Sequence, residues 1–268
     1  MAIALQQLAS TLPLLLFGLL ALGVWRRLAP DRGRGTLGPA RDRATLAWGL
    51  TTANFLIVGT YATAHSLLSA LAIAMGKGSW PYEVTWYWAF PANVGRDAAS
   101  VVYGAMLLGL MTLDRRAGLR IVAVAWRVLV AVAVLGTIAA RVILPHDAYH
   151  AHFALQAVLF AATAIVLMAA LVAAVLNDGQ DLLLWLALTA YALKQVVTVS
   201  LVGVMASWAV APQGNAMRIL YWTGIAVGAA TVALAARRLQ LAAAGRRVPG
   251  VFEWLESLRR PAPAQRPL

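Results

Sequence analysis

Long apolar stretches separated by short polar connections run through almost the whole chain. They cover residues 8–25, 46–75, 97–113, 121–144, 153–176, 182–211 and 217–236. A helix needs about 20 predominantly apolar residues to cross the hydrocarbon of a bilayer. The pattern therefore predicts an all-α fold, a polytopic membrane protein with a bundle of seven transmembrane helices over residues 1–240. Residues 241–268 are expected to form a cytoplasmic tail, amphipathic at first and then disordered.

The distribution of lysine and arginine predicts the orientation of this bundle. Six arginines follow the first stretch, three follow the third and seven follow the last, against four basic residues in the alternate connections. The side that carries more basic residues is normally cytoplasmic. We therefore expect the N-terminus outside and the C-terminus in the cytoplasm, most simply in a bacterial cytoplasmic membrane. The net charge of +12 then reflects contact with anionic lipid headgroups rather than with nucleic acid.

Two segments have the composition of membrane-surface elements. The connection 76–97 contains three tryptophans and two tyrosines, and we expect it to lie along the outer leaflet, since such rings prefer the headgroup level. A lid over an aromatic ligand is the alternative. In the tail, apolar and charged residues alternate at helical spacing over 251–258, which predicts a short helix on the anionic lipid surface.

Polar residues recur at helical spacing inside two of the predicted spans. In 46–75 they include Asn54, Tyr61 and His65, and in 182–211 they are Tyr191, Lys194, Gln195 and Thr198. Residues at such spacing share one helix face, and a polar face is expensive against lipid. The two stripes either hold helices together by hydrogen bonds or line an internal cavity.

Lys194 lies in the middle of its span, where a charge costs about 3 kcal/mol on insertion scales. No aspartate or glutamate is expected at comparable depth in another span, so the ammonium has no predicted ion-pair partner. A lysine removed from water can carry protons, form a Schiff base or hold an anionic ligand. We therefore take Lys194 and Tyr191 as candidate catalytic or ligand-orienting residues, with a purely structural role as the alternative.

A histidine cluster precedes the fifth predicted span. If it is helical, His146 and His150 share a face with Asp147 nearby; if it is extended, His150 and His152 point the same way. Either geometry suits zinc, copper or iron, and His65 paired with His152 would suit haem b. A solvated, pH-sensitive connection is the alternative. Cysteine is absent, which excludes thiolate metal sites, disulfides and iron–sulfur clusters.

These features support three hypotheses for function. The first is a metal- or haem-dependent redox enzyme, or a subunit of one, acting on a lipid-soluble substrate in the membrane. The second is a seven-helix transporter or receptor that binds an anionic small ligand at Lys194. The third is an assembly or scaffold subunit, since a GxxxG pair at Gly224 and Gly228 favours close packing within a homodimer or against a membrane partner.

Overall fold

The computed structural model describes residues 16, 19, 39–145, 147–177, 181–207, 213–244, 246 and 248–259. All of the secondary structure in these residues is α-helical, as the sequence predicts. The helices are α2 (Pro39–Met75), α3 (Trp80–Thr112), α4 (Arg115–Ile143), α5 (Tyr149–Asn177), α6 (Leu182–Ser207), α7 (Gln213–Ala243) and α8 (Val251–Arg259).

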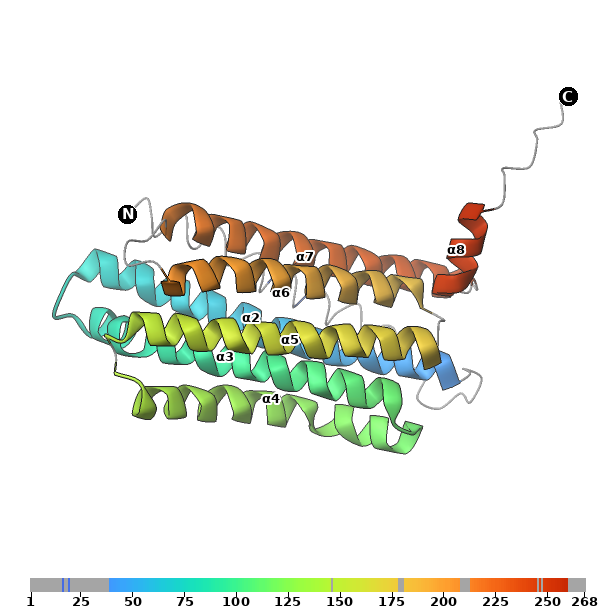
Figure 1. The fold of residues 1–268 in the computed structure, drawn as a ribbon, viewed down its shortest axis with the longest axis horizontal. Coiled ribbons are helices and arrows are strands. Elements are labelled where there is room, and N and C mark those ends of the chain that lie inside the picture. Colours follow the sequence, from blue (N-terminus) through green and yellow to red (C-terminus); the bar gives the residue numbers. More distant parts are fainter. Residues whose placement is uncertain are drawn as a thin grey trace, which may run out of the picture.

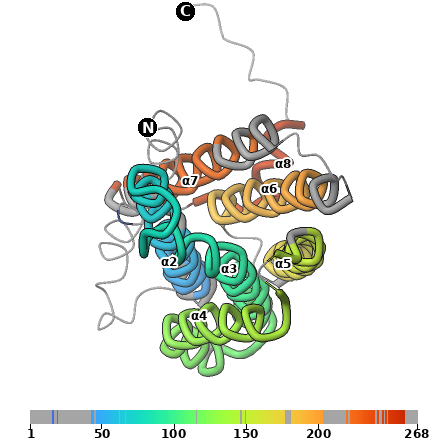
Figure 2. The backbone as a smooth tube through the Cα atoms, turned by 90° about the vertical axis from the view of Figure 1, so that its left-hand side faces the viewer, coloured from blue at the N-terminus to red at the C-terminus, as the bar shows by residue number. Residues whose placement is uncertain are grey.

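Six long helices run side by side in alternating directions, and the short α8 crosses one end of the bundle (Figure 1). In the end-on view α3 lies between α2, α4 and α5 (Figure 2). It packs against all three, while α6 packs against α5 and α7. Helix α3 is therefore the central element, and side chains on its several faces reach α2, α4 and α5.

Five of the described helices are long and apolar enough to cross a membrane. These candidate spans are Leu46–Met75, Trp80–Thr112, Arg116–Ile143, His150–Leu176 and Leu182–Val202. Helix α7 is 31 residues long but is not among these five, and the predicted first span, 8–25, lies outside the described residues except for residues 16 and 19. The count of seven spans and the orientation therefore stay predictions.

The sequence suggested that the segment 76–97 is a separate connection along the outer leaflet. In the structure most of it belongs to a helix, and its position relative to the membrane stays a prediction. A short turn with Gly76 and Gly78 at positive φ leads directly into α3, which begins at Trp80 with a proline in its first turn. Proline at this position favours helix initiation, because its φ angle is already helical. The aromatic segment is thus the first half of a continuous helix of 33 residues.

Glycines bring α3 and α4 into backbone contact. A Cβ atom on Gly95 would overlap the carbonyl oxygen of Ala133 and the side chain of Thr137, and one on Gly136 would lie 3.0 Å from the Cα of Gly95. Small residues at such a crossing allow two membrane helices to pack closely without side chains between them. The position of α3 relative to α4 is therefore fixed at the level of Gly95.

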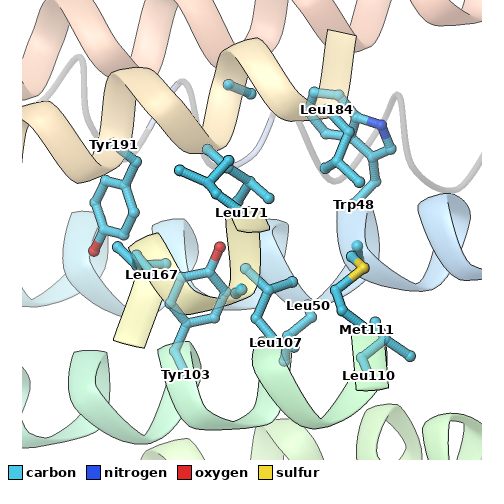
Figure 3. Close-up of a cluster of buried hydrophobic side chains, with 14 of the residues drawn as sticks. Trp48, Leu50, Tyr103, Leu107, Leu110, Met111, Leu167, Leu171, Leu184 and Tyr191 are labelled. Carbon is cyan, nitrogen blue, oxygen red and sulfur yellow. The ribbon is translucent and has the colours of Figure 1, made fainter. Parts of the chain in front are cut away.

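The interior has an apolar half and a polar half. The apolar half lies toward the end where α2 begins and α3 ends, and its core includes Trp48, Leu107, Leu110, Leu171 and Leu188 (Figure 3). The polar half lies toward the α2–α3 turn. Its buried polar side chains include Thr63, Ser69, Asp97, His152, Gln156, Gln195 and Thr198.

The end of the bundle beside α8 is held by polar contacts between α6, α7 and the segment that follows α7. Arg238 donates to Asp181 (Nε–Oδ2 2.6 Å), and Asp181 also accepts from the backbone N–H of Leu184. The backbone N–H of Leu182 donates to the carbonyl of Pro249 at 3.1 Å. The predicted tail helix is present as α8, and its contact with lipid stays a prediction.

Candidate charged site inside the bundle

An ion pair lies near the middle of the central helix. Arg96 donates from Nε to the Oδ1 atom of Asp97 at 2.7 Å, and the Asp97 side chain is only 1% exposed. Asp97 is 17 residues from Trp80, or about 26 Å along the helix axis. Its second oxygen, Oδ2, has no hydrogen-bond partner among the described residues.

This finding corrects the expectation that no acidic residue lies as deep as Lys194. The predicted third span began at residue 97 because the charges of Arg96 and Asp97 interrupt the apolar run. In the structure α3 extends well before them, and each charge neutralises the other. Asp97 is therefore an interior group rather than a residue at the end of a span.

Lys194 lies at the middle of α6, about 18 Å along the axis from Leu182. Its ammonium is 5.7 Å from the centroid of the Phe160 ring on α5 and 6.0 Å from that of the Tyr191 ring, distances at which an aromatic ring attracts a cation. It is close enough to Arg96 and Asp97 to interact electrostatically with both. No described carboxylate forms a direct ion pair with it.

Tyr191 joins α2, α3 and α6 one turn away from Lys194. Its hydroxyl accepts a hydrogen bond from Asn54 Nδ2 at 3.0 Å and lies close to the side chain of Ser100 on α3. The Tyr191 ring lies 6.0 Å from that of Tyr103, and the hydroxyl of Tyr103 lies 2.9 Å from that of Thr51. The structure thus brings the stripes of α2 and α6 together, with α3 supplying the groups between them.

The remaining residues of the α2 stripe flank Arg96. The guanidinium carbon lies 5.3 Å from the centroid of the Tyr61 ring, and the Tyr61 hydroxyl donates to the carbonyl of Ala89 at 3.0 Å. The His65 ring is stacked at 6.1 Å from that of Tyr61. A continuous series of polar and aromatic groups therefore runs from His65 to the ion pair.

Two residues predicted to line a cavity, Gln195 and Thr198, lie on α6 beside Lys194. Gln195 is 1% exposed, and its Oε1 atom has no hydrogen-bond partner among the described residues. Thr198 is also buried, but its hydroxyl donates to the carbonyl of Lys194 at 2.8 Å. Gln195 therefore retains an acceptor for another group, whereas the proton of the Thr198 hydroxyl is already used.

The members of the predicted metal site that the structure describes do not converge. Helix α5 begins at Tyr149, so His150 and His152 point in nearly opposite directions, because successive residues of a helix are about 100° apart. His150 and Asp147 are exposed, whereas His152 is fully buried. In the described part of the chain no three His, Asp or Glu side chains lie close enough together to hold a metal ion. His146 lies outside the described residues.

The structure also separates the two histidines expected to hold a haem. The His152 ring stacks on Phe90 of α3 at 5.7 Å, and its Nε2 atom lies 3.2 Å from the carbonyl oxygen of Pro145. His65 contacts Tyr61 on α2. Helix α3 packs between α2 and α5, so the two imidazoles lie on different sides of it.

Sequence reasoning missed the contribution of α3 to the site. Asp97, Ser100 and Tyr103 follow one another at intervals of three residues, a spacing that places them on one helix face. That pattern was available in the sequence, but it crosses the boundary at which the third span was predicted to begin. In the structure α3 begins at Trp80, so all three residues lie inside one helix.

Comparisons with known proteins add no functional information. No protein-family model matches the chain, no curated protein matches its sequence, and no solved structure matches its fold. The function must therefore be argued from the geometry of the site.

Proposed function

We propose that the chain is a membrane carrier or receptor that binds a small anionic ligand at Lys194, inside a seven-helix bundle. The observation that carries this proposal is the unequal pairing of the interior charges. Arg96 is paired directly with Asp97, whereas Lys194 interacts with them only at longer range and has no direct ion pair among the described residues.

The site therefore carries two cations and one carboxylate when all three groups are charged. A charge inside the membrane is costly, and such groups normally face a bundle interior and mark a ligand or ion pathway. An anionic ligand would bring the local charge to neutrality and give the ammonium a direct partner. Phe160 and Tyr191 hold the ammonium in place without satisfying its three hydrogen-bond donors.

The hydrogen bonds around Tyr191 give the site a means of responding to a ligand. One turn of α6 separates Tyr191 from Lys194, and the Tyr191 hydroxyl is bonded to Asn54 on α2. A ligand that displaces Lys194 would therefore shift a side chain that links α6 to α2 and α3. Both transport and signal reception require such coupling between ligand contacts and helix positions.

We propose that the C-terminus of the chain lies in the cytoplasm, and the charged groups at the two ends of the bundle support this orientation. Arg43 of α2 hydrogen-bonds to the carbonyl of Leu113, just after α3 ends, and Arg238 of α7 lies where α6 begins, so both arginines lie at one end of the bundle. Lys77 lies in the turn at the other end. The arginine-rich end would face the cytoplasm.

The metal- or haem-dependent redox function is not the one that the geometry favours. The described histidines lie on different helices or face in different directions, as shown above. A scaffold function explains the close glycine contact between α3 and α4, but it does not explain three charged residues near the middle of two helices.

The proposal is tested by ligand binding to the purified protein in lipid nanodiscs. Calorimetric titration with L-leucine and with 4-methylpentanoate, which both carry a carboxylate and an apolar body, should give saturable binding. Lys194→Met should abolish that binding. The matched control is Leu193→Met, because Leu193 is the neighbouring residue and is 61% exposed on the outer face of α6. Equal binding by the two variants, or no binding of either compound to the unaltered protein, would contradict the proposal.

A further inference from the structure

Two buried acceptor atoms lack hydrogen-bond partners in the described structure, one on Asp97, which interacts electrostatically with Lys194, and one on Gln195, which follows Lys194 in α6. They are Oδ2 of Asp97 on α3 and Oε1 of Gln195 on α6, and both side chains are 1% exposed. Buried polar groups are almost always hydrogen-bonded, and an exception calls for a bound group that satisfies it. Each of these two atoms can therefore accept a hydrogen bond from a bound group.

The side chains that surround these acceptors do not supply the donors. Arg96 donates from Nε and from Nη2 to the other oxygen of Asp97. Ser100 donates to the carbonyl of Arg96. The Lys194 ammonium lies against the ring of Phe160 and makes no direct ion pair with Asp97. None of these described side chains donates to the two acceptors, and a bound ligand with N–H groups can do so.

We infer that the ligand at Lys194 is amphoteric, with an anionic group for Lys194 and a separate ammonium or N–H group for Asp97 Oδ2 and Gln195 Oε1. The inference rests on the proposed function and narrows its ligand class. A ligand with only an anionic group would satisfy Lys194, but it would approach Asp97 with a charge of the same sign and leave both acceptors unpaired. An α-amino acid or a similar zwitterion supplies both charges.

The aromatic residues beside the site favour a ligand that also has an apolar part. The Phe160 ring lies beside the ammonium of Lys194, and the Phe55 ring lies 5.6 Å from that of Tyr191. A branched aliphatic side chain packs well against such rings. L-leucine is therefore a suitable probe, since its carboxylate, ammonium and aliphatic parts can each be tested.

Three compounds of matched skeleton separate the contributions of these parts. 4-Methylpentanoate is L-leucine without the ammonium, and 3-methylbutan-1-amine is L-leucine without the carboxylate. In calorimetric titrations of the nanodisc-embedded protein, L-leucine should bind at least tenfold more tightly than either analogue. The dissociation constant ratio between 4-methylpentanoate and L-leucine then measures the ammonium contribution.

Substitutions at the two acceptors should reduce this ratio. Asp97→Asn should lower it about tenfold by removing the negative charge, and Gln195→Leu should lower it by removing one acceptor while keeping the Arg96–Asp97 pair. The matched control is Asp181→Asn, because Asp181 is bonded to Arg238 at the end of the bundle. That variant should leave the ratio unchanged.

The outcomes distinguish this inference from the proposed function. If 4-methylpentanoate binds the unaltered protein as tightly as L-leucine, the ligand class is wrong while anion binding at Lys194 stands. The same conclusion follows if both acceptor variants keep the original ratio. If neither compound binds the unaltered protein, both the inference and the proposed function are wrong.

Discussion

Replacing Asp97 by alanine should strongly destabilise the bundle, and the loss should depend on Lys194. The substitution leaves Arg96 and Lys194 as interior cations without the Asp97 carboxylate, which interacts with both. Removing one partner of a buried ion pair typically costs about 3–5 kcal/mol, and we expect a loss of that size. Lys194→Met in the same chain removes one of the two remaining cations and should restore part of the stability.

A double-mutant cycle measures this dependence. The free energy of unfolding is determined by denaturant titration of the protein in detergent micelles for Asp97→Ala, Lys194→Met and the double variant. Interacting residues typically give coupling energies of about 0.5–3 kcal/mol. The free energy of unfolding of the double variant should therefore exceed, by this amount, the value expected from adding the two single losses. In the control, Lys77→Met at the exposed turn combined with Asp97→Ala should be additive within about 0.5 kcal/mol. If the effects of Asp97→Ala and Lys194→Met on the free energy of unfolding are additive, Asp97 and Lys194 do not interact and their described positions are wrong.

Three further predictions concern packing, the end of the bundle and access to the site. Gly95→Ala should lower the free energy of unfolding by about 1–3 kcal/mol, because its Cβ would overlap the backbone of α4. Gly104→Ala, whose Cβ would meet side-chain atoms of Val166 at 3.3 and 3.4 Å but no backbone atom of another helix, should cost clearly less; equal losses would show that the helices do not cross as described. Arg238→Ala should destabilise the protein by about 3 kcal/mol in the same titration, since it leaves a largely buried carboxylate unpaired; a loss below about 0.5 kcal/mol would contradict this. In single-cysteine variants, Thr198→Cys in the polar half should react with a membrane-impermeant methanethiosulfonate reagent faster than Leu188→Cys in the apolar half, and equal rates would argue against a hydrated polar half.

The apolar pattern predicts most of the fold because membrane helices are specified by long runs of similar residues. The predicted stretch 153–176 lies within α5, and 121–144 ends one residue beyond α4; both contain few charged residues. The predicted beginning of the third stretch was wrong, because the charges of Arg96 and Asp97, considered one at a time, resemble the polar end of a span. Their mutual neutralisation depends on side-chain geometry, which hydropathy along the chain does not contain.

The candidate site was only partly predictable for a related reason. Helical spacing shows that Asn54 shares a face with other polar residues of its helix, and that Tyr191 and Lys194 do the same on theirs. It does not show which helix stands opposite, so the role of α3 became clear only from the packing. The predicted metal site at the histidine cluster was wrong for another reason, since the directions of its side chains depend on the residue at which α5 begins. With the helix starting at Tyr149, His150 and His152 diverge.

Ligand binding at Lys194 requires that its side chain face the interior of the bundle rather than lipid, and spin labelling tests this most directly. The chain contains no cysteine, so Leu193→Cys and Lys194→Cys each provide a single labelling site in protein reconstituted into bilayers. Molecular oxygen concentrates in the hydrocarbon and reports exposure to lipid through its collision rate with the label. We expect a high oxygen collision rate at position 193 and a several-fold lower rate at position 194. Equally high rates at both positions would place Lys194 against the acyl chains and contradict the proposed site.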